Sequence, residues 1–234
     1  MSSGTLIIVP TFNEAENIPG VLAALQVALP SAHTLVVDDA SADGTSRLVE
    51  QLAHTQAGLH LLRRPAKLGL GTAYVDGFRW GLERGYERFF EMDADFSHDP
   101  MRLRAFVSAL DAGADVVVGS RNMPGGRVEG WGPLRHVLSK GGSLYSRLLL
   151  GVSVCDLTTG FKAYTRQALE SIDIGSLRSN GYAFQIETTY RALRCGLRVV
   201  EIPIVFVDRR AGRSKMSLAD VLEAVTGVIR MRLR

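Results

Sequence analysis

Hydrophobic and polar positions alternate in blocks along the first half of the chain. Short, continuous apolar runs, typical of strands buried on both faces, are separated by longer stretches with helical periodicity. The predicted strands cover residues 5–9, 35–37, 59–63, 89–92 and 115–118, and the predicted helices cover about residues 13–29, 45–53, 71–85 and 100–110. Because strands and helices alternate, the pattern indicates an α/β fold with a mostly parallel, Rossmann-like sheet flanked by helices.

Two further amphipathic stretches follow in the second half of the chain. Residues 131–150 predict a helix that starts at Pro133, since proline is tolerated in the first helical turn. Residues 216–234 place apolar side chains at helical spacing and end in an arginine-rich segment, residues 230–234. A helix of this second kind can lie in an anionic membrane surface, or it can pack on the core of the domain.

Composition narrows the class of protein. The chain has 234 residues, 46% hydrophobic and 22% charged, so we expect a single globular domain over residues 1–234. The basic residues are mostly arginine, which suits bidentate binding of phosphate, although an arginine-rich genome would give the same excess. Cys155 and Cys195 have no metal-ligand or redox spacing, which fits a reducing, intracellular compartment. Neither a signal peptide nor a membrane-spanning run is expected from the pattern.

Two carboxylates one residue apart follow the predicted strand 89–92. Residues i and i+2 of an extended segment point the same way, so Asp93 and Asp95 can aim at one point. Carboxylates that converge without a basic neighbour favour a divalent cation, and magnesium is often held by one or two carboxylates together with substrate phosphates. The alternative is that both are solvated turn residues before Pro100.

Polar residues also follow three other predicted strands. They are residues 10–14, 38–39 and 119–121, and ligands of open α/β sheets bind at these carboxyl ends. The first strand is followed neither by Gly-x-Gly-x-x-Gly nor by a P-loop, which disfavours a dinucleotide or P-loop site. A metal on Asp93 and Asp95, with nearby arginines, would instead neutralise the phosphates of a nucleotide diphosphate.

Several segments resemble a known family. Val-Pro-Thr-Phe-Asn-Glu (9–14), Val-Val-Asp-Asp-Ala-Ser-Ala-Asp-Gly-Thr (36–45), Glu-Met-Asp-Ala-Asp (91–95) and Gly-Ser-Arg (119–121) are similar to the family 2 glycosyltransferases of the A-type fold. Leu-Ser-Lys (138–140), Asp-Leu-Thr-Thr-Gly-Phe-Lys-Ala-Tyr (156–164), Gly-Tyr-Ala-Phe-Gln-Ile-Glu (181–187) and Gly-Arg-Ser-Lys-Met-Ser (212–217) resemble its polyprenol (dolichol) phosphate mannose synthases. The similarity runs in order from about residue 5 to residue 220.

The resemblance implies a set of residues for the nucleotide sugar. Those expected to bind base and ribose are Pro10, Phe12, Glu14, Val37 and Asp39, and those expected at the diphosphate are Asp93, Ala94, Asp95, Arg121, Arg209 and Lys215. The implied cofactor is a divalent metal, Mg²⁺ or Mn²⁺, on Asp93 and Asp95. Ser97 would be a weaker third ligand, because it stands where the family has a longer glutamine. Phe12 replaces an expected tyrosine, which preserves stacking but loses a hydroxyl.

The acceptor end is implied in the same way. Arg121, Arg135 and Ser139 would hold the phosphate of a lipid, and Arg135 and Ser139 share a helix face because they are spaced i, i+4. A plain surface helix with a solvated arginine is the alternative. Residues 122–234 would supply the acceptor-side elements and the C-terminal helix. Arg209 and Lys215 lie in a polar, glycine-containing segment, residues 208–215, that reads as a mobile lid.

The implied reaction is transfer of mannose from GDP-mannose to a polyprenyl monophosphate with inversion. Asp95 and Arg121 are the candidate catalytic residues, and no base is nominated because a phosphate monoester is largely dianionic at neutral pH. Two alternatives keep the fold: a UDP-glucose-dependent polyprenyl-phosphate glucosyltransferase, and transfer to a hydroxyl of another glycan. A third is a non-catalytic nucleotide-sugar-binding subunit.

The lipid acceptor sets the expected location. We expect the protein in the cytoplasm, peripheral on the cytoplasmic face of a membrane, held there by the helix of residues 216–234 and assisted by the apolar side of residues 131–150. A separate membrane-spanning protein is a further candidate partner. No nucleic acid is expected among the partners.

Overall fold

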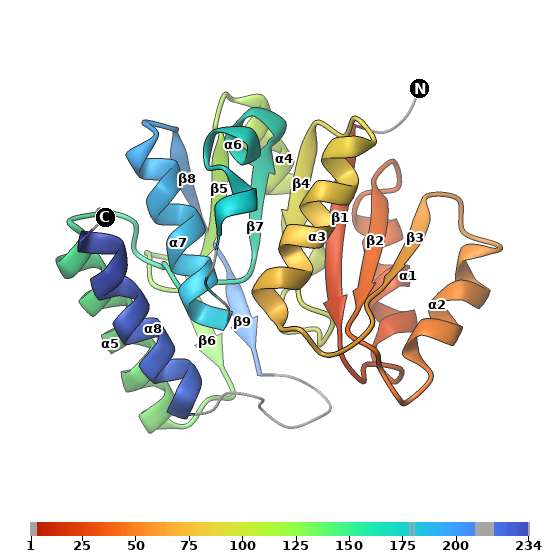
Figure 1. Cartoon of the computed structure of the whole chain (residues 1–234), viewed down its shortest axis with the longest axis horizontal. Helices are drawn as coiled ribbons and strands as arrows, with labels where there is room; N and C mark the ends of the chain where they lie inside the picture. The colour runs from red at the N-terminus through yellow and green to blue at the C-terminus, as the bar shows by residue number, and fades with distance from the viewer. Residues whose placement is uncertain (1–3, 178, 180, 209–217, 234) are drawn as a thin grey trace.

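The chain folds around one seven-stranded sheet with helices on both faces (Figure 1). The computed structural model describes residues 4–177, 179, 181–208 and 218–233. The strand order is β3-β2-β1-β4-β7-β5-β8, and the only antiparallel neighbours within the described part of the sheet are those of β7. The predicted α/β fold with a mostly parallel sheet is therefore confirmed.

The five predicted strands are all present. They are β1 (Thr5–Thr11), β2 (His33–Asp38), β3 (Leu59–Arg63), β4 (Arg88–Glu91) and β5 (Val116–Ser120). Four more strands were not predicted: β7 (Lys162–Thr165) and β8 (Val199–Pro203) in the same sheet, and β6 (Arg127–Glu129) with β9 (Val205–Val207) in a separate parallel pair. β7 runs antiparallel between β4 and β5, so its first residues lie at the carboxyl ends of both neighbours.

The predicted helices are present, and further helical segments between residues 166 and 194 were not predicted. In the first half they are α1 (Ile18–Ala28), α2 (Thr45–Ala53), α3 (Leu70–Glu83), the 3-10 turn η1 (Pro100–Arg102) and α4 (Leu103–Asp111). In the second half they are α5 (Pro133–Leu150), α6 (Arg166–Ser171), the 3-10 turn η2 (Ile174–Ser176), α7 (Gly181–Arg194) and α8 (Leu218–Leu233). The prediction of a helix beginning at Asn13 or Glu14 is wrong. Asn13 has a φ of 56°, and residues 12–17 form a bend and turn that is tied to the loop after β2.

Alternation along the strands divides the apolar side chains into two cores. Leu6 and Ile8 of β1 face the side covered by α3, α6 and α7, whereas Ile7 and Val9 face the side covered by α1 and α4. All four are almost fully buried. Because both faces of the sheet are covered, ligands reach the strands at their ends, which directs attention to the carboxyl edge.

α5 and α8 lie side by side at one flank of the molecule (Figure 1). Tyr145 on α5 donates to the backbone oxygen of Val225 on α8 at 3.3 Å, and Val228 and Met231 of α8 are buried. The expected packing of the C-terminal helix on the domain is thus present. Its other side, and that of α5, expose apolar side chains, which are Val137, Leu144, Leu148, Val225, Ile229 and Leu233. Among the described residues no helix is long and apolar enough to cross a membrane.

Candidate active site

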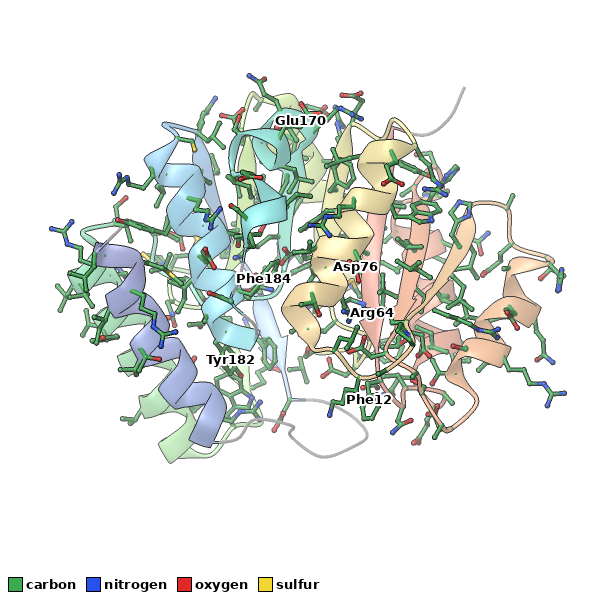
Figure 2. All side chains as sticks on the ribbon, viewed as in Figure 1. Phe12, Arg64, Asp76, Glu170, Tyr182 and Phe184 are labelled. Carbon is green, nitrogen blue, oxygen red and sulfur yellow. The ribbon has the colours of Figure 1, made fainter. Side chains whose placement is uncertain are left out.

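The chemistry-bearing segments meet at one edge of the sheet. β1, β2 and β4 are parallel to one another, and β5 has the same direction because both it and β4 are antiparallel to β7. The carboxyl ends of these strands therefore bring together residues 10–14, 38–39, 93–95 and 120–121. Figure 2 shows Phe12 at this edge, below the lower ends of α3 and α7.

The loop after β2 is held by one buried carboxylate. Asp38 accepts hydrogen bonds from the hydroxyls of Thr11 (2.7 Å), Ser41 (2.5 Å) and Ser46 (2.6 Å), and from the Ser41 amide at 3.0 Å. Burial alone would raise the pKa of Asp38, but these hydrogen bonds together lower it. Asp38 therefore stays ionised and locks the first two strand ends together.

Asp39, expected near the ribose, is part of a second network. One of its oxygens accepts from Arg64, and the other accepts from the amide of Gly69 at 3.0 Å. Arg64 also contacts Asp76 at 3.1 Å and donates to the Thr72 hydroxyl at 2.6 Å (Figure 2). Arg64 is only 6% exposed, so this ion pair fixes the loop between β3 and α3 against the end of β2.

The expected base-binding residues surround the end of β1. Pro10 and Val37 are register partners on neighbouring strands, so they lie side by side. The carboxylate of Glu14 accepts from the Asn17 side chain at 2.9 Å. Phe12 is partly buried and carries the Lys67 ammonium 4.3 Å from its ring centroid. An aromatic ring, a carboxylate and a cation are thus gathered where a base would stack and hydrogen-bond.

Asp93 and Asp95 follow β4 at the middle of this edge. Asp93 has a side chain that is 33% exposed, whereas Asp95 is buried and accepts from the Ser97 amide (3.1 Å) and hydroxyl (2.5 Å). The extended conformation predicted for residues 93–95 is wrong beyond Asp93. Residues 94–96 bend, because Asp95 caps the following amide and Phe96 has a φ of 61°. Ala94 is buried within this bend.

The side chains at this edge fit a divalent cation whose remaining coordination positions are filled by oxygens of the substrate. The described residues contain no cluster of three or more His, Cys, Asp or Glu side chains that could hold a metal alone. Two carboxylates with a partly exposed Asp93 are instead what magnesium uses when phosphates fill its other positions. Ser97 uses its hydroxyl hydrogen on Asp95, which leaves the oxygen lone pairs for a ligand. His98 stacks on Phe161, and burial lowers its pKa to about 4, so the ring is neutral at pH 7.

A buried polar layer lies behind Asp93. Glu91 of β4 and Lys162 of β7 are register partners, and both are fully buried. Burial raises the pKa of Glu91 to about 7 and lowers the pKa of Lys162 to about 8. Tyr164 donates to Glu91 at 3.2 Å, and Lys162 donates to the backbone oxygen of Gln185 at 2.5 Å. This layer ties β4, β7 and α7 together directly beneath the edge.

Arg121 is held by a bidentate ion pair after β5. Its Nε and Nη2 donate to the two oxygens of Asp156 at 2.7 and 2.8 Å, and its amide donates to the same carboxylate at 3.0 Å. Asp156 is fully buried; burial raises its pKa, but the Arg121 charge and hydrogen bonds lower it overall. Asp156 thus fixes the position of Arg121 at the carboxyl edge. The Nε and Nη2 hydrogen-bond donors of Arg121 that face Asp156 are already used.

Arg135 approaches the same place from α5. Its Nη1 donates to Asp208 at 2.9 Å, and its guanidinium lies 4.2 Å from the ring centroid of Trp131. The guanidinium of Arg121 lies 5.7 Å from the centroid of the same ring, so both arginines lie close to Trp131. Ser139 follows Arg135 by one turn on α5. Arg209 and Lys215 lie outside the described residues.

Comparison with known proteins now identifies the family. Residues 6–173 match the model of "Glycosyl transferase family 2". The chain belongs to glycosyltransferase family 2. It is 48% identical over 231 residues to a "Polyprenol monophosphomannose synthase" of Mycolicibacterium smegmatis, covering 98% of this chain and 87% of that protein. It is 47% identical over 228 residues to an "Undecaprenyl-phosphate mannosyltransferase" of Micrococcus luteus, covering 97% and 93%. The resemblance noted in the sequence is confirmed.

A solved structure supports the fold of this family 2 glycosyltransferase. The mannosyltransferase PcManGT from Pyrobaculum calidifontis, in complex with GDP-Man and Mn²⁺, superposes with a TM-score of 0.58 at 22% identity. The match covers 90% of this chain but 58% of that one, so this chain spans less than two thirds of the neighbour. At this identity the likeness shows the fold, and the expected A-type fold is confirmed.

Three groups of this family 2 glycosyltransferase site were missed in the sequence. Arg64 was not singled out in the sequence, because its partner Asp39 is 25 positions away. Asp156 lies in a segment that carried the resemblance, but nothing in the spacing connects it to Arg121. Trp131 was used only to mark a helix start, although an aromatic residue between two functional arginines is a usable signal for cation–π contacts.

Proposed function

We propose that the protein transfers mannose from GDP-mannose to a polyprenyl monophosphate, giving polyprenyl phosphate mannose and GDP. The near full-length identity to two proteins whose names describe this kind of transfer carries the proposal. The geometry supports it, because a pair of carboxylates suited to a metal–diphosphate lies on the same edge as two arginines gathered around Trp131.

The residues divide the work between donor and acceptor. When a divalent cation is bound by Asp93 and Asp95, it supplies positive charge for the departing diphosphate. Arg135, with Arg121 and Ser139, would orient the acceptor phosphate, whose oxygen forms a bond to the anomeric carbon as the bond to the GDP oxygen breaks. Attack from the face opposite the leaving group inverts the anomeric centre. The nucleophile is already dianionic, so positioning and charge stabilisation replace a general base.

A donor screen tests this function. Purified protein is given a polyprenyl phosphate and either GDP-mannose or UDP-glucose, with Mg²⁺ or Mn²⁺, and the lipid product is identified by mass spectrometry. We expect a hexose-bearing lipid phosphate from GDP-mannose and none in the Asp93→Asn control. Product from UDP-glucose alone would replace the proposal with a glucosyltransferase. Product from neither donor, with nucleotide sugar still bound, would favour a non-catalytic subunit.

We also propose that residues 1–234 act as one catalytic domain that docks on a membrane surface through α5 and α8. The six exposed apolar side chains of these two helices form the proposed contact, and arginines in the last turn of α8 add attraction to anionic lipid. This surface would act on the cytoplasmic face, alone or with a membrane-spanning partner.

Liposome flotation tests the docking surface. Wild-type protein should float with anionic vesicles at low salt and less at high salt. Leu148→Gln, on the most exposed apolar position of α5, should reduce flotation. Val27→Gln is the matched control, because Val27 is similarly exposed on α1. Equal loss in both variants, or no flotation of an active protein at low salt, would leave only a protein partner as the anchor.

A further inference from the structure

A small space lined by polar atoms lies beside Asp93. The point where a Cβ on Gly160 would sit is 3.5 Å from Nε2 of Gln185 and 3.7 Å from both carboxylate oxygens of Asp93. These are the nearest atoms to that point, and the distances are ordinary van der Waals contacts. Gly160 therefore leaves open a position that is bounded by an amide and a carboxylate.

The side-chain amide of Gln185 is buried near Glu91 without a hydrogen bond to a described residue. Gln185 is 2% exposed, and both Nε2 and Oε1 lack a hydrogen-bond partner among the described residues. The backbone oxygen of the same residue is heavily used, accepting from Lys162 (2.5 Å), Thr188 (3.2 Å) and Thr189 (3.2 Å). The amide moderates the raised pKa of nearby Glu91, but without the geometry of a hydrogen bond. An unpaired buried amide costs free energy, which a bound hydroxyl would recover.

The order of the strands places this space between donor phosphate and acceptor. Along the carboxyl edge, β2 and β1 carry the proposed nucleoside residues, Asp93 follows β4, the start of β7 follows Gly160, and Arg121 follows β5. Nucleoside, diphosphate, sugar and acceptor phosphate are connected in the same order in the reacting complex. The group that falls between Asp93 and Arg121 is the sugar. Figure 2 shows Tyr182, three residues before Gln185, at the lower end of α7, toward this edge.

We propose that Gln185 is a sugar-binding residue whose carboxamide hydrogen-bonds hydroxyls of the transferred hexose in the space beside Gly160. This inference rests on the proposed function. A carboxamide offers two donors and an acceptor in one plane, which suits a pair of neighbouring hydroxyls. Because a site that hydrogen-bonds a substrate hydroxyl discriminates strongly against analogues with that hydroxyl missing, Gln185 also contributes to the choice of sugar.

Gln185→Met tests the proposal, because methionine keeps the length of the side chain and removes its polar atoms. Binding of GDP and of GDP-mannose is measured separately, with donor kinetics and urea unfolding. We expect unchanged GDP affinity, a loss of roughly ten- to a hundred-fold in GDP-mannose binding or in kcat/KM, and a stability equal to or above that of the wild type. Gln26→Met is the matched control, since it makes the same substitution on α1, where the amide of Gln26 accepts from Gln56 at 3.1 Å, and donor kinetics should not change.

Gly160→Ala provides a second, independent variant. Its methyl group meets only ordinary contacts, so the protein should fold, yet it narrows the space. We expect weakened GDP-mannose binding with GDP binding retained. Equal changes for GDP and GDP-mannose, or a Gln185→Met protein that is less stable with normal donor kinetics, would show that Gln185 only supports Glu91. If the wild type uses another nucleotide sugar, the proposed function fails, and the same comparison with that donor and its nucleotide judges Gln185 separately.

Discussion

The proposed donor and acceptor ends of the site are built differently. At the donor end, Asp38 accepts four hydrogen bonds, Asp39 is held by Arg64 and a backbone amide, and the side chains of Asp38, Asp39 and Arg64 are buried. At the acceptor end, Arg135 is ion-paired with Asp208 in the described part of the chain, and the two side chains are 22% and 35% exposed. The donor end is prepared before substrate arrives, whereas the acceptor end holds a contact that a phosphate can replace.

This difference has a physical reason. A fully desolvated, multiply bonded pair loses much when one partner is removed, whereas an exposed single pair contributes about 0–1 kcal/mol. A phosphate can therefore replace Asp208 as the partner of Arg135 with little loss of free energy. Arg121 is the exception at the acceptor end, because its pair with Asp156 is as buried as those of the donor end.

The largest effect is expected at the donor end. Asp93→Asn and Asp95→Asn should each reduce transfer by roughly 10²–10³-fold or more, because charge on the leaving group loses its stabilisation. Stability should change little, since Asp93 is partly exposed and asparagine at 95 keeps an oxygen for Ser97. Turnover measured against Mg²⁺ or Mn²⁺ concentration, with circular dichroism, checks both points. Full wild-type activity without a divalent cation would show that the reaction does not use a metal.

Arg121→Leu should mainly destabilise the fold. It leaves the fully buried Asp156 without its partner, a change that typically costs about 3–5 kcal/mol. Urea unfolding measures the loss, and the double variant Arg121→Leu with Asp156→Leu should recover part of it. An Arg121→Leu protein of normal stability that binds acceptor poorly would place Arg121 with Arg135 as an exchangeable phosphate ligand.

Arg135→Ala should weaken the acceptor and spare the fold. Loss of a hydrogen-bonded charge on the phosphate should raise the acceptor KM by roughly ten- to a hundred-fold, about 1.5–3 kcal/mol. GDP binding and the urea midpoint should stay close to those of the wild type, because the pair with Asp208 is partly exposed. Equal damage to donor and acceptor constants would show that Arg135 serves the donor end.

The smallest effect is expected from Asp208→Asn. This variant weakens the ion pair that competes for Arg135, so the acceptor KM should fall by a few-fold, equivalent to at most about 1 kcal/mol. Steady-state kinetics with a short-chain polyprenyl phosphate checks this, and Arg127→Ala, which disrupts an exposed pair with Glu129 on β6, is the control. A raised acceptor KM would mean that Asp208 positions Arg135 rather than competing for it.

The sequence predicted the first half of the fold well for a physical reason. β1, β2 and β5 are buried on both faces, so their apolar runs are continuous and stand out from the helices. β7 escaped detection because Lys162 and Tyr164 look like surface residues, whereas in the fold they contact Glu91 on the neighbouring strand β4 and Thr188 on α7. A buried polar layer of this kind is defined by partners far apart in the chain, which no local pattern reports.

Prediction of the site from the sequence had the same limit, because contacts between distant residues are not visible in a local pattern. Asp93 and Asp95 were found because both the chemistry and the position, directly after a strand, are visible in the chain. The resemblance supplied Arg135 and Ser139, and the structure shows their helix but leaves their roles as proposals. Arg64 and Asp156 could not be found by spacing, because each works through a buried carboxylate–guanidinium contact that only the folded chain creates.

The position of β7 also constrains the order in which the chain can fold. β3, β2, β1 and β4 pair with one another from residues that precede position 92, so this part of the sheet can form early. β5 pairs only with β7 and β8 in the described sheet, and both come later in the chain. During synthesis β5 can pair only after residues 162–165 have been made, so the donor end should gain protection from hydrogen exchange before β5, the strand that precedes Arg121.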